Sequence, residues 1–596
     1  MSDTQSPAIE TILAEERRYP PPPEFAAQAN AQPDIYDEDF ESFWEREGRE
    51  RVSWFEPFTQ LYEWKPPYAK WFLGGKTNVT HNCVDRHVEA GLGGKVAYYW
   101  EGEPADERRE ITYADLQRET TKLANALKAI GVRKGTPIGI YMGMVPETPI
   151  AMLACARIGA PHTVVFGGFS ADSLSDRLQD MECEVLITQD EAWRRGTAVP
   201  LKRTADEAVE SSPTVKNVVV LRRTGNEVPM QEGRDHWWHE VATDETAYPC
   251  EPMDSEDLLY LLYTSGTTAK PKGIVHTTAG YLCGVATTHH YIFDVKPESV
   301  YWCAADVGWV TGHSYIVYGP LANGTTGVLY EGTPDFPDKD RWWEIVERYE
   351  VDILYTAPTA IRAHMKWGTE HAAKHDLSSL RLLGSVGEPI NPEAWEWYRR
   401  HIGGGRTPVV DTWWQTETGM ILITPLPGVT TTKPGSATQP FPGIDAAVYD
   451  EQGNEVGPGG GGYLVLRRPW PAMLRGIHKA DGRYRETYWS KYDGVYFAGD
   501  GARIDEDGDF WLLGRVYDVM NVSGHRISTI EVESALVDHA GVAEAAVVGS
   551  ADELTGQAIM AYVIVRGGVD PTPELGEELR QHVAHKIGPT ARPKTV

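Results

Sequence analysis

Residues 263–273 read YTSGTTAKPKG and begin where the apolar run DLLYLLY (257–263) ends. The apolar run predicts a buried strand, and the small residues after it let backbone N–H groups approach phosphate oxygens. Hydroxyl groups and Lys270 or Lys272 would supply further hydrogen-bond donors. The alternative is an ordinary polar hairpin loop, because Gly, Ser and Thr are common turn residues. Pro271 stands where a Walker A loop has its second glycine, which argues against a P-loop NTPase.

Around this loop, predicted strands alternate with predicted helices. The stretch KVAYYWEG (95–102) predicts a strand, and Thr112 with Asp115 predicts the capping box of a helix that ends at Gly131. The apolar run PIGIYM (137–142) is typical of a buried parallel strand. This order predicts an α/β fold with parallel, helix-covered sheets. Further strands are expected at 162–166, 299–304, 352–356, 380–386 and 408–411.

Changes in composition along the chain divide it into five parts. Residues 1–35 are polar and proline-rich and predict an extended N-terminal arm, while residues 36–92 are rich in aromatics and predict a cap. Residues 93–442 form the predicted α/β core. Residues 443–515 contain short strands broken by Gly, Asp and Pro, which favours hairpins in a small barrel-like β subdomain. Residues 516–596 predict a small α+β domain with elements at 518–522, 529–539, 542–548, 558–565 and 573–587.

The chain is strongly acidic. It has 596 residues, with 86 Asp and Glu against 56 Lys and Arg, which gives a formal net charge of −30. Such a surface repels nucleic acid and anionic membranes, so we expect neither as a partner. A high-salt cytoplasm would screen the self-repulsion, which favours a halophilic, haloarchaeal source. An ordinary acidic enzyme is the alternative.

The cysteines and the apolar runs bear on the cellular compartment. None of the six cysteines forms a CxxC pair, and several lie in apolar runs, so we expect buried free thiols in a reducing, cytoplasmic environment. The N-terminus has no apolar signal core. No run of about 18 apolar residues occurs, so no membrane span is expected.

The loop TSGTTAKPKG (264–273) is similar to the signature loop of the adenylate-forming superfamily, which includes acyl-CoA synthetases, luciferases and peptide-synthetase adenylation domains. The stretches FGGFS (166–170) and DVGWVTGHSY (306–315) resemble the acetyl-CoA synthetases within that family. The resemblance extends from about residue 36 to the end of the chain. Other stretches match in the family's order: Gly387–Pro389, Asp411–Glu417, Tyr496–Asp500, Gly514-Arg515 and Asn521–Arg526.

This resemblance implies a two-step ligase reaction. ATP and acetate would give acetyl-AMP and pyrophosphate, with Mg²⁺ as cofactor, and coenzyme A would then take the acetyl group and release AMP. Propionate would be a weaker substrate. One alternative is an adenylate-binding or regulatory protein without catalysis, and another is a family member with a different acyl acceptor.

The resemblance also implies roles for individual residues. Asp500 would accept hydrogen bonds from the ribose hydroxyls, and Arg515 would reach the ribose or the α-phosphate. The alternatives are an aspartate at a strand-end turn and a surface arginine. The implied catalytic residues are Thr264, Ser265, Gly266, Thr267, Thr268, Lys272 and Arg526. The implied ATP and AMP contacts are Gly387, Glu388, Pro389, Asp411, Thr412, Trp413, Trp414, Gln415, Thr416, Asp500, Arg515 and Arg526.

The acyl and coenzyme A sites follow from the same resemblance. Trp414 would shorten an acyl pocket completed by Val310, Thr311 and Val386, whereas the alternative is a core aromatic. The implied coenzyme A contacts are Arg194, Thr311, Ser523, Gly524 and Arg526, and the alternative for Arg194 is a solvated charge.

Two metal sites are implied. Glu417 would bind Mg²⁺ together with the ATP phosphates. A second metal loop would use Val537, His539 and Val542, although a histidine at a helix end is also a common cap.

The sequence departs from the family pattern in three places. It ends at ARPKTV, before the point where the family carries its adenylation lysine, so we expect a fragment or a naturally truncated chain with an incomplete C-terminal domain. Tyr517 occupies the hinge to this mobile domain, where relatives carry Asp or Lys. Ala584 replaces an arginine that contacts coenzyme A.

Overall fold

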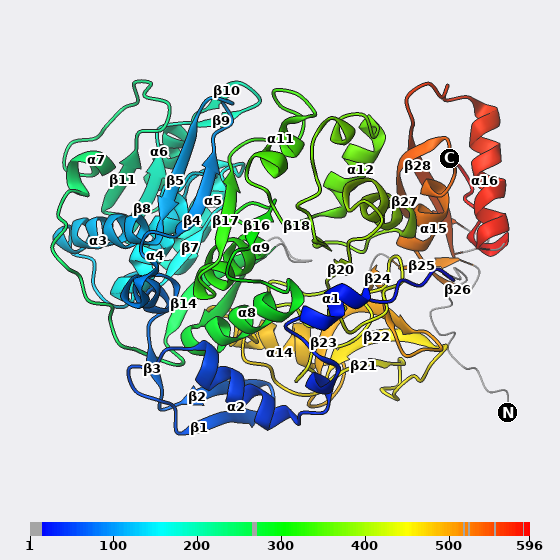
Figure 1. Ribbon diagram of the computed structural model, residues 1–596, viewed down its shortest axis with the longest axis horizontal. Helices are drawn as coiled ribbons and strands as arrows, with labels where there is room; N and C mark the ends of the chain where they lie inside the picture. The colour runs from blue at the N-terminus through cyan, green and yellow to red at the C-terminus, as the bar shows by residue number, and fades with distance from the viewer. Residues whose placement is uncertain (1–14, 265–270, 517–518, 523–524, 553–555, 588) are drawn as a thin grey trace.

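Two seven-stranded sheets form the framework of the large N-terminal part of the molecule (Figure 1). The structure is a computed structural model that describes residues 15–264, 271–516, 519–522, 525–552, 556–587 and 589–596. The first sheet has the order β12 (Asp235–Trp237), β11 (Asn217–Leu221), β8 (Val185–Gln189), β6 (Ile138–Tyr141), β7 (His162–Val164), β14 (Leu258–Thr264) and β15 (Lys272–Thr277). The second has the order β20 (Val409–Asp411), β19 (Leu382–Ser385), β18 (Ile353–Thr356), β16 (Val300–Cys303), β17 (Thr326–Tyr330), β4 (Val96–Glu101) and β5 (Arg108–Thr112).

Most neighbouring strands in both sheets are parallel. Among the described residues, the exceptions are the edge pairs β14–β15 and β4–β5, which are antiparallel. The strands expected from apolar runs are therefore confirmed, and so is their parallel arrangement. β14 and β15 form a hairpin whose connection lies mostly outside the described residues.

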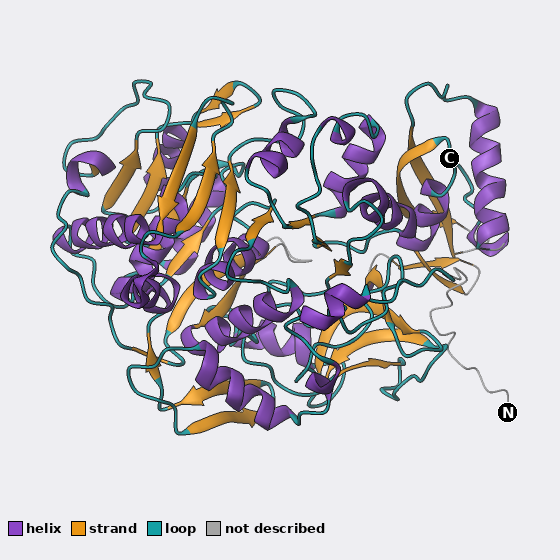
Figure 2. Ribbon diagram, viewed as in Figure 1, coloured by secondary structure: helices purple, strands orange, loops and turns teal. Residues whose placement is uncertain are grey.

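Helices cover both sheets (Figure 2). α3 (Tyr113–Ala129) begins with the expected capping box, in which the Asp115 N–H donates to Thr112 Oγ1 over 3.1 Å and the Thr112 N–H donates to Asp115 Oδ2 over 2.9 Å. α5 (Ala171–Met181) and α6 (Leu201–Glu210) share an apolar core with the first sheet. α8 (Thr278–Ile292) is buried along almost its whole length.

The sequence predicts an extended N-terminal arm, but the described part of the arm contains a helix. α1 (Pro23–Gln28) is a short helix with proline at its first position, where a missing N–H group costs nothing. Phe25 on this helix is buried, which explains why the segment folds back onto the large domain. The expectation for residues 1–14 lies outside the described residues.

The aromatic segment after the arm, for which the sequence predicts a cap, packs against the main domain. It consists mainly of α2 (Phe40–Arg51), β1 (Gln60–Lys65) and β2 (Tyr68–Leu73). Phe43 and Trp44 are fully buried, and the Phe43 ring lies 6.0 Å from the ring of Phe441.

The β subdomain is an open sheet and not the barrel-like unit we expected. β21 (Ala446–Tyr449), β22 (Gly461–Leu466), β23 (Tyr496–Ile504) and β24 (Phe510–Arg515) pair in sequence order, and all pairs are antiparallel. Among the described residues no pairing joins β21 to β24, so these four strands do not close into a barrel. α14 (Asp481–Trp489) contacts β23 instead.

The C-terminal domain has its own apolar core. Its sheet has the order β26 (His525–Ser528), β25 (Val519–Val522), β28 (Gly556–Val565) and β27 (Val542–Asp552), with α15 (Thr529–Val537) and α16 (Pro573–Lys586) beside it. The expected α+β elements are present, and β26 is an additional strand. α15 contacts β24 and α13 (Pro392–Trp397) of the large domain.

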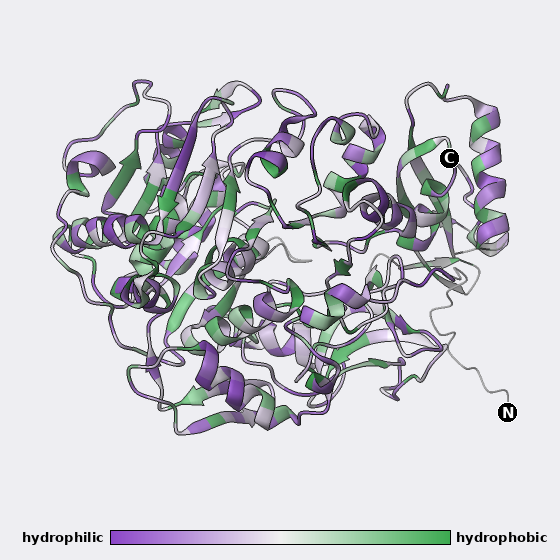
Figure 3. Cartoon of the chain, viewed as in Figure 1, coloured by the Kyte–Doolittle hydropathy of each residue, from purple (hydrophilic) through white to green (hydrophobic). Residues whose placement is uncertain are grey.

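Hydropathy follows this arrangement. In Figure 3 the buried strand β11 is hydrophobic, whereas the edge strand β5 is hydrophilic. No helix in the described part of the chain has the length and apolar character needed to cross a membrane.

Candidate active site

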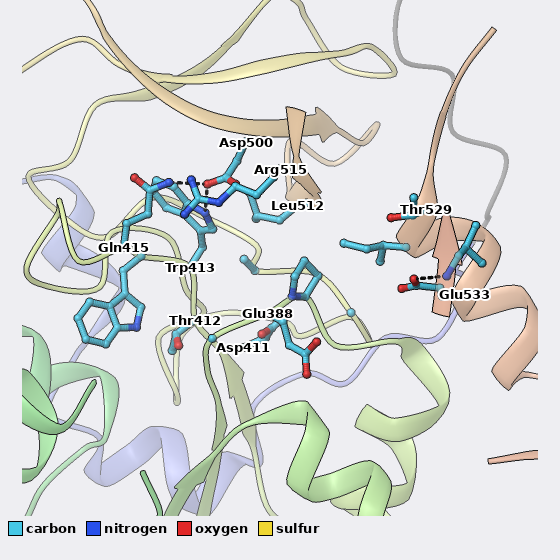
Figure 4. A pocket seen from close by; sticks show the side chains of 18 residues that line it. Glu388, Asp411, Thr412, Trp413, Gln415, Asp500, Leu512, Arg515, Thr529 and Glu533 are labelled. Carbon is cyan, nitrogen blue, oxygen red and sulfur yellow. Dashed lines mark hydrogen bonds and ion pairs between the residues drawn. The ribbon is translucent and has the colours of Figure 1, made fainter. Parts of the chain in front are cut away.

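A cavity of about 440 Å³ lies where the second sheet, the β subdomain and the C-terminal domain meet (Figure 4). Its lining includes ten of the residues expected to contact ATP and AMP. The C-terminal domain adds four residues that the sequence did not indicate: Thr529, Ile530, Glu533 and Val547. The ten expected residues are Gly387, Glu388, Pro389, Asp411, Thr412, Trp413, Trp414, Gln415, Asp500 and Arg515.

The carboxylate of Asp500 has partners on both of its oxygens. Trp413 Nε1 and Gln415 Nε2 donate to Asp500 Oδ2 over 3.1 Å and 2.7 Å, as the dashed lines in Figure 4 show. Arg515, paired with Asp500 across β23 and β24, places its Nε 3.5 Å from Oδ1. Burial raises the pKa of Asp500, and the Arg515 charge opposes that shift. The carboxylate therefore has a fixed orientation, with Oδ1 on the side of Arg515.

Gln415 is in turn oriented by Tyr496, whose hydroxyl donates to Gln415 Oε1 over 3.1 Å. Gln415 Nε2 also donates to the carbonyl oxygen of Ala498 over 2.8 Å. Tyr496 is the first residue of β23, so the strand that carries Asp500 also orients one of its hydrogen-bond donors.

The floor of the cavity is formed where parallel strands of the second sheet end. Thr412, after β20, donates its hydroxyl to the Ser385 carbonyl over 2.7 Å. Gly387 has a φ of +100°, and no atom lies within 4 Å of the place a Cβ would occupy. A left-handed residue with open space beside it is suited to close approach by a ligand. Burial raises the pKa of Asp411 to about 7.

The expected acyl-pocket residues are only partly brought together. Trp414 lines the cavity, its Nε1 donates to Tyr355 Oη over 3.3 Å, and its ring lies edge-on to Tyr315 at 4.9 Å. Val386 is buried directly after β19. Val310 and Thr311 are absent from this lining, and they begin α9 (Val310–Gly312) beside a second cavity.

The second cavity, of about 910 Å³, adjoins the first and shares Gly387 and Arg515 with it. Four further expected residues line it: Thr264, Lys272, Thr416 and Glu417. Ser265, Gly266, Thr267 and Thr268, which connect β14 to β15, lie outside the described residues.

Glu417 is buried and paired. Lys272 Nζ lies 3.2 Å from its Oε1, and the Tyr488 hydroxyl donates to the same oxygen over 2.5 Å. Lys272 Nζ also donates to Tyr488 Oη over 2.8 Å. Burial opposes the charge of Glu417, but Lys272 and Tyr488 together hold its pKa below the usual value. An ionised carboxylate with its second oxygen outside these bonds fits a magnesium site completed by ATP phosphates.

Tyr488 is a site residue that sequence reasoning missed. Its ring is stacked on that of Tyr496 at 5.4 Å, so it connects the surroundings of Glu417 with those of Asp500. An aromatic residue in a helix is more often a core residue, and the sequence carries no signal that distinguishes the two roles.

Both ring nitrogens of His539 have partners within the chain. Its Nδ1 accepts from the Gly541 N–H over 3.2 Å, and its Nε2 lies 3.1 Å from Glu578 Oε1. Val537 ends α15, and the Val542 N–H donates to the His539 carbonyl over 3.0 Å. The metal loop proposed for these residues stays a prediction.

A separate cluster of three aspartates pairs with a lysine side chain of the same chain. Asp505, Asp507 and Asp509 bring carboxylate oxygens within 4.8 Å of one another. Lys433 Nζ lies 2.6 Å, 2.7 Å and 2.6 Å from these three side chains, and Lys433 is buried. The ammonium group therefore occupies the position that a metal ion would need.

The residues expected to contact coenzyme A lie on both the large domain and the C-terminal domain. Arg194 is exposed at the end of β9 (Ala192–Arg194), close enough for its charge to act on Asp306, whose pKa burial raises to about 6. Ser523, Gly524 and the hinge residue Tyr517 lie outside the described residues. Arg526 lies in β26, and Ala584 lies in α16.

Comparisons with known proteins bear directly on this site. The family model described as AMP-binding enzyme matches residues 84–478, and the AMP-binding enzyme C-terminal domain matches residues 531–596. The acetyl-coenzyme A synthetase N-terminus matches residues 35–83. The chain belongs to the AMP-binding enzymes. The resemblance inferred from its motifs is confirmed.

Similar proteins named acetyl-coenzyme A synthetase occur in several bacteria. One from Rubrobacter xylanophilus is 61% identical over 585 residues, which cover 97% of this chain and 91% of the relative. One from Streptomyces avermitilis is 59% identical over 596 residues, covering 99% and 91%, respectively. One from Gemmatimonas aurantiaca is 60% identical over 603 residues, covering 99% and 92%. This AMP-binding enzyme is thus similar to acetyl-coenzyme A synthetases along almost its whole length.

Proposed function

We propose that this AMP-binding enzyme is an acetate–CoA ligase. It joins acetate to coenzyme A and converts ATP to AMP and pyrophosphate. The observation that carries the proposal is the Asp500 cavity, in which motifs from three parts of the chain converge in a protein 61% identical to an acetyl-coenzyme A synthetase.

The first half-reaction forms acetyl-AMP. Asp500 accepts hydrogen bonds from the ribose hydroxyls, and Arg515 lies beside it to contact the ribose or the α-phosphate. The acetate carboxylate attacks the α-phosphorus, and pyrophosphate leaves. Charge develops at the phosphoryl oxygens, and hydrogen-bond donors of the chain stabilise it: Thr264, Ser265, Gly266, Thr267, Thr268 and Lys272.

Glu417 and Thr416 are the proposed residues for Mg²⁺ and the phosphates. When bound, Mg²⁺ neutralises phosphate charge. Lys272 and Tyr488 keep Glu417 ionised and hold one of its oxygens, so that the carboxylate keeps one orientation. Gly387 to Pro389 and Asp411 to Thr412 line the proposed place of the adenine ring.

The preference for acetate rests on Trp414. Its indole ring fills space that longer acyl chains would need, with Val310, Thr311 and Val386 as the other proposed pocket residues. One methylene changes discrimination by only about 1–3 kcal/mol, so propionate is a poorer substrate and not an excluded one.

The second half-reaction transfers the acetyl group. The coenzyme A sulfur attacks the acetyl carbon, the thiol proton is lost, and AMP leaves. Arg194 is the proposed contact for the phosphates of coenzyme A on the large domain. On the C-terminal domain the proposed contacts are Ser523, Gly524 and Arg526. The six cysteines are all free, which supports work in a reducing, cytoplasmic environment.

The test measures each half-reaction separately. Acetate-dependent exchange of pyrophosphate into ATP reports the first, and formation of acetyl-CoA from supplied acetyl-AMP reports the second. We expect both, with acetate preferred over propionate. A chain that binds ATP but catalyses neither half-reaction is the regulatory alternative, and one that makes acetyl-AMP without using coenzyme A has a different acceptor.

A further inference from the structure

The hairpin that carries Arg194 has a tight two-residue turn. β9 pairs with β10 (Thr197–Val199), Arg194 lies opposite Thr197, and Arg195 and Gly196 form the turn. Their φ angles are +49° and +73°. Positive values at both positions are typical of a type I′ turn, a conformation that is unfavourable for a residue other than glycine. Contacts outside the hairpin offset this cost at Arg195.

Glu103 supplies such contacts. Its Oε2 accepts from the Arg195 N–H over 2.8 Å, and its Oε1 accepts from the Gly196 N–H over 2.7 Å. Glu103 is only 1% exposed. Hydrogen bonds to a carboxylate are stronger than those between neutral groups, so both oxygens of one buried side chain fix the turn.

The backbone of Glu103 is itself held by an ion pair between Arg223 and Glu331. Its N–H donates to Glu331 Oε2 over 3.0 Å, and Arg223 donates to both oxygens of Glu331 over 2.8 Å and 2.7 Å. Glu331 and Glu103 lie at the carboxyl ends of the neighbouring strands β17 and β4. The hairpin turn is thus connected to the second sheet through the Glu103 side chain.

We propose that Glu103 is a positioning residue for coenzyme A. It holds the β9–β10 turn so that the adjacent Arg194 guanidinium has one location beside the phosphates of coenzyme A. Asp306 lies close enough to the same guanidinium for the two charges to interact. The proposal rests on the proposed function and adds to it the means by which an exposed arginine acquires a defined position.

The experiment supplies acetyl-AMP and varies the concentration of coenzyme A. In Glu103→Gln the amide NH₂ faces one of the two turn N–H groups, so one hydrogen bond is lost. We expect KM for coenzyme A to rise about tenfold while kcat and KM for acetyl-AMP stay the same. In an Arg194→Ala background the same change should have little further effect, because Glu103 acts through Arg194.

Two variants keep the test decisive. Glu103→Asp keeps the carboxylate on a side chain that is one methylene shorter, so the carboxylate no longer reaches the turn. This variant should also raise KM for coenzyme A. Asp352→Asn is a matched control, since Asp352 Oδ1 also accepts a backbone N–H, from Val300 over 2.8 Å, far along the sheet. It should leave KM for coenzyme A unchanged.

An unchanged KM for coenzyme A in folded Glu103→Gln, or an equal rise with and without Arg194, would overturn the proposal. So would an Arg194→Ala variant with normal KM, because Arg194 would then make no contact. Failure of the proposed function has a different result: the unmodified chain would form no acetyl-CoA from acetyl-AMP at all.

Discussion

The two sides of the 440 Å³ cavity are built differently. On the large domain, Asp500 is fixed by Trp413 and Gln415 and lies beside Arg515. On the C-terminal domain, the facing residues belong to a unit with a separate apolar core, and Glu533 accepts from the Val547 N–H within that unit. The large domain therefore supplies the fixed polar groups of this cavity, and the C-terminal domain supplies the opposite wall.

The largest expected effect tests this comparison directly. Asp500→Ala should weaken AMP binding by about 100-fold, because hydrogen bonds to a charged group contribute about 1.5–3 kcal/mol each. Glu533→Gln, on the opposite wall of the cavity, should change AMP affinity less than threefold. Isothermal titration calorimetry measures both, and equal losses in the two folded variants would remove the distinction between the walls.

The next effect sharpens the description of the large-domain side. Trp414→Gly should raise activity with butyrate relative to acetate by about 10- to 100-fold, since each added methylene is worth about 1–3 kcal/mol. Rates with acetate, propionate and butyrate give the profile. Trp413→Phe is a control that removes a donor to Asp500, and it should lower nucleotide affinity without changing chain-length preference. An unaltered profile in Trp414→Gly means that this residue does not limit the pocket.

A smaller effect concerns pH. Burial raises the pKa of Asp411 to about 7 from an ordinary value of 3.8, so the folded protein binds more protons than the unfolded chain between these values. The stability contributed by Asp411 is therefore present at low pH and decreases as pH rises toward 7. In Asp411→Asn this decrease should be absent. Melting temperatures of both proteins between pH 5 and about 8 check it, and parallel curves contradict it.

The smallest expected effect is that of salt on the melting temperature. The net charge of −30 should make the melting temperature rise with added potassium chloride, because screening reduces repulsion between exposed carboxylates. A halophilic source predicts a rise that continues to molar salt, whereas an ordinary acidic enzyme reaches a plateau once the charges are screened. Thermal scans at increasing salt concentration distinguish them.

Much of the fold could be predicted because buried parallel strands appear as apolar runs, as in β6 and β18. Residues 496–500 and 411–417 were also recognised as site segments. The sequence could not indicate that Gln415 contacts both Asp500 and Tyr496, because these contacts join residues more than 80 positions apart. Glu103 lies in a charged loop and was not distinguishable from a surface residue until its two backbone partners were known.

Lys433 has a further consequence for the turn between β23 and β24. Its ammonium group pairs with Asp505, Asp507 and Asp509, and Lys433 lies two residues before Gly435 in the cavity wall. In many proteins an acidic turn of this kind depends on dissolved calcium, so its order varies with supply. Here the cation is the Lys433 side chain, which is part of the polypeptide and is always present. We therefore expect this wall to keep its shape in the presence of a chelator and to be insensitive to calcium concentration.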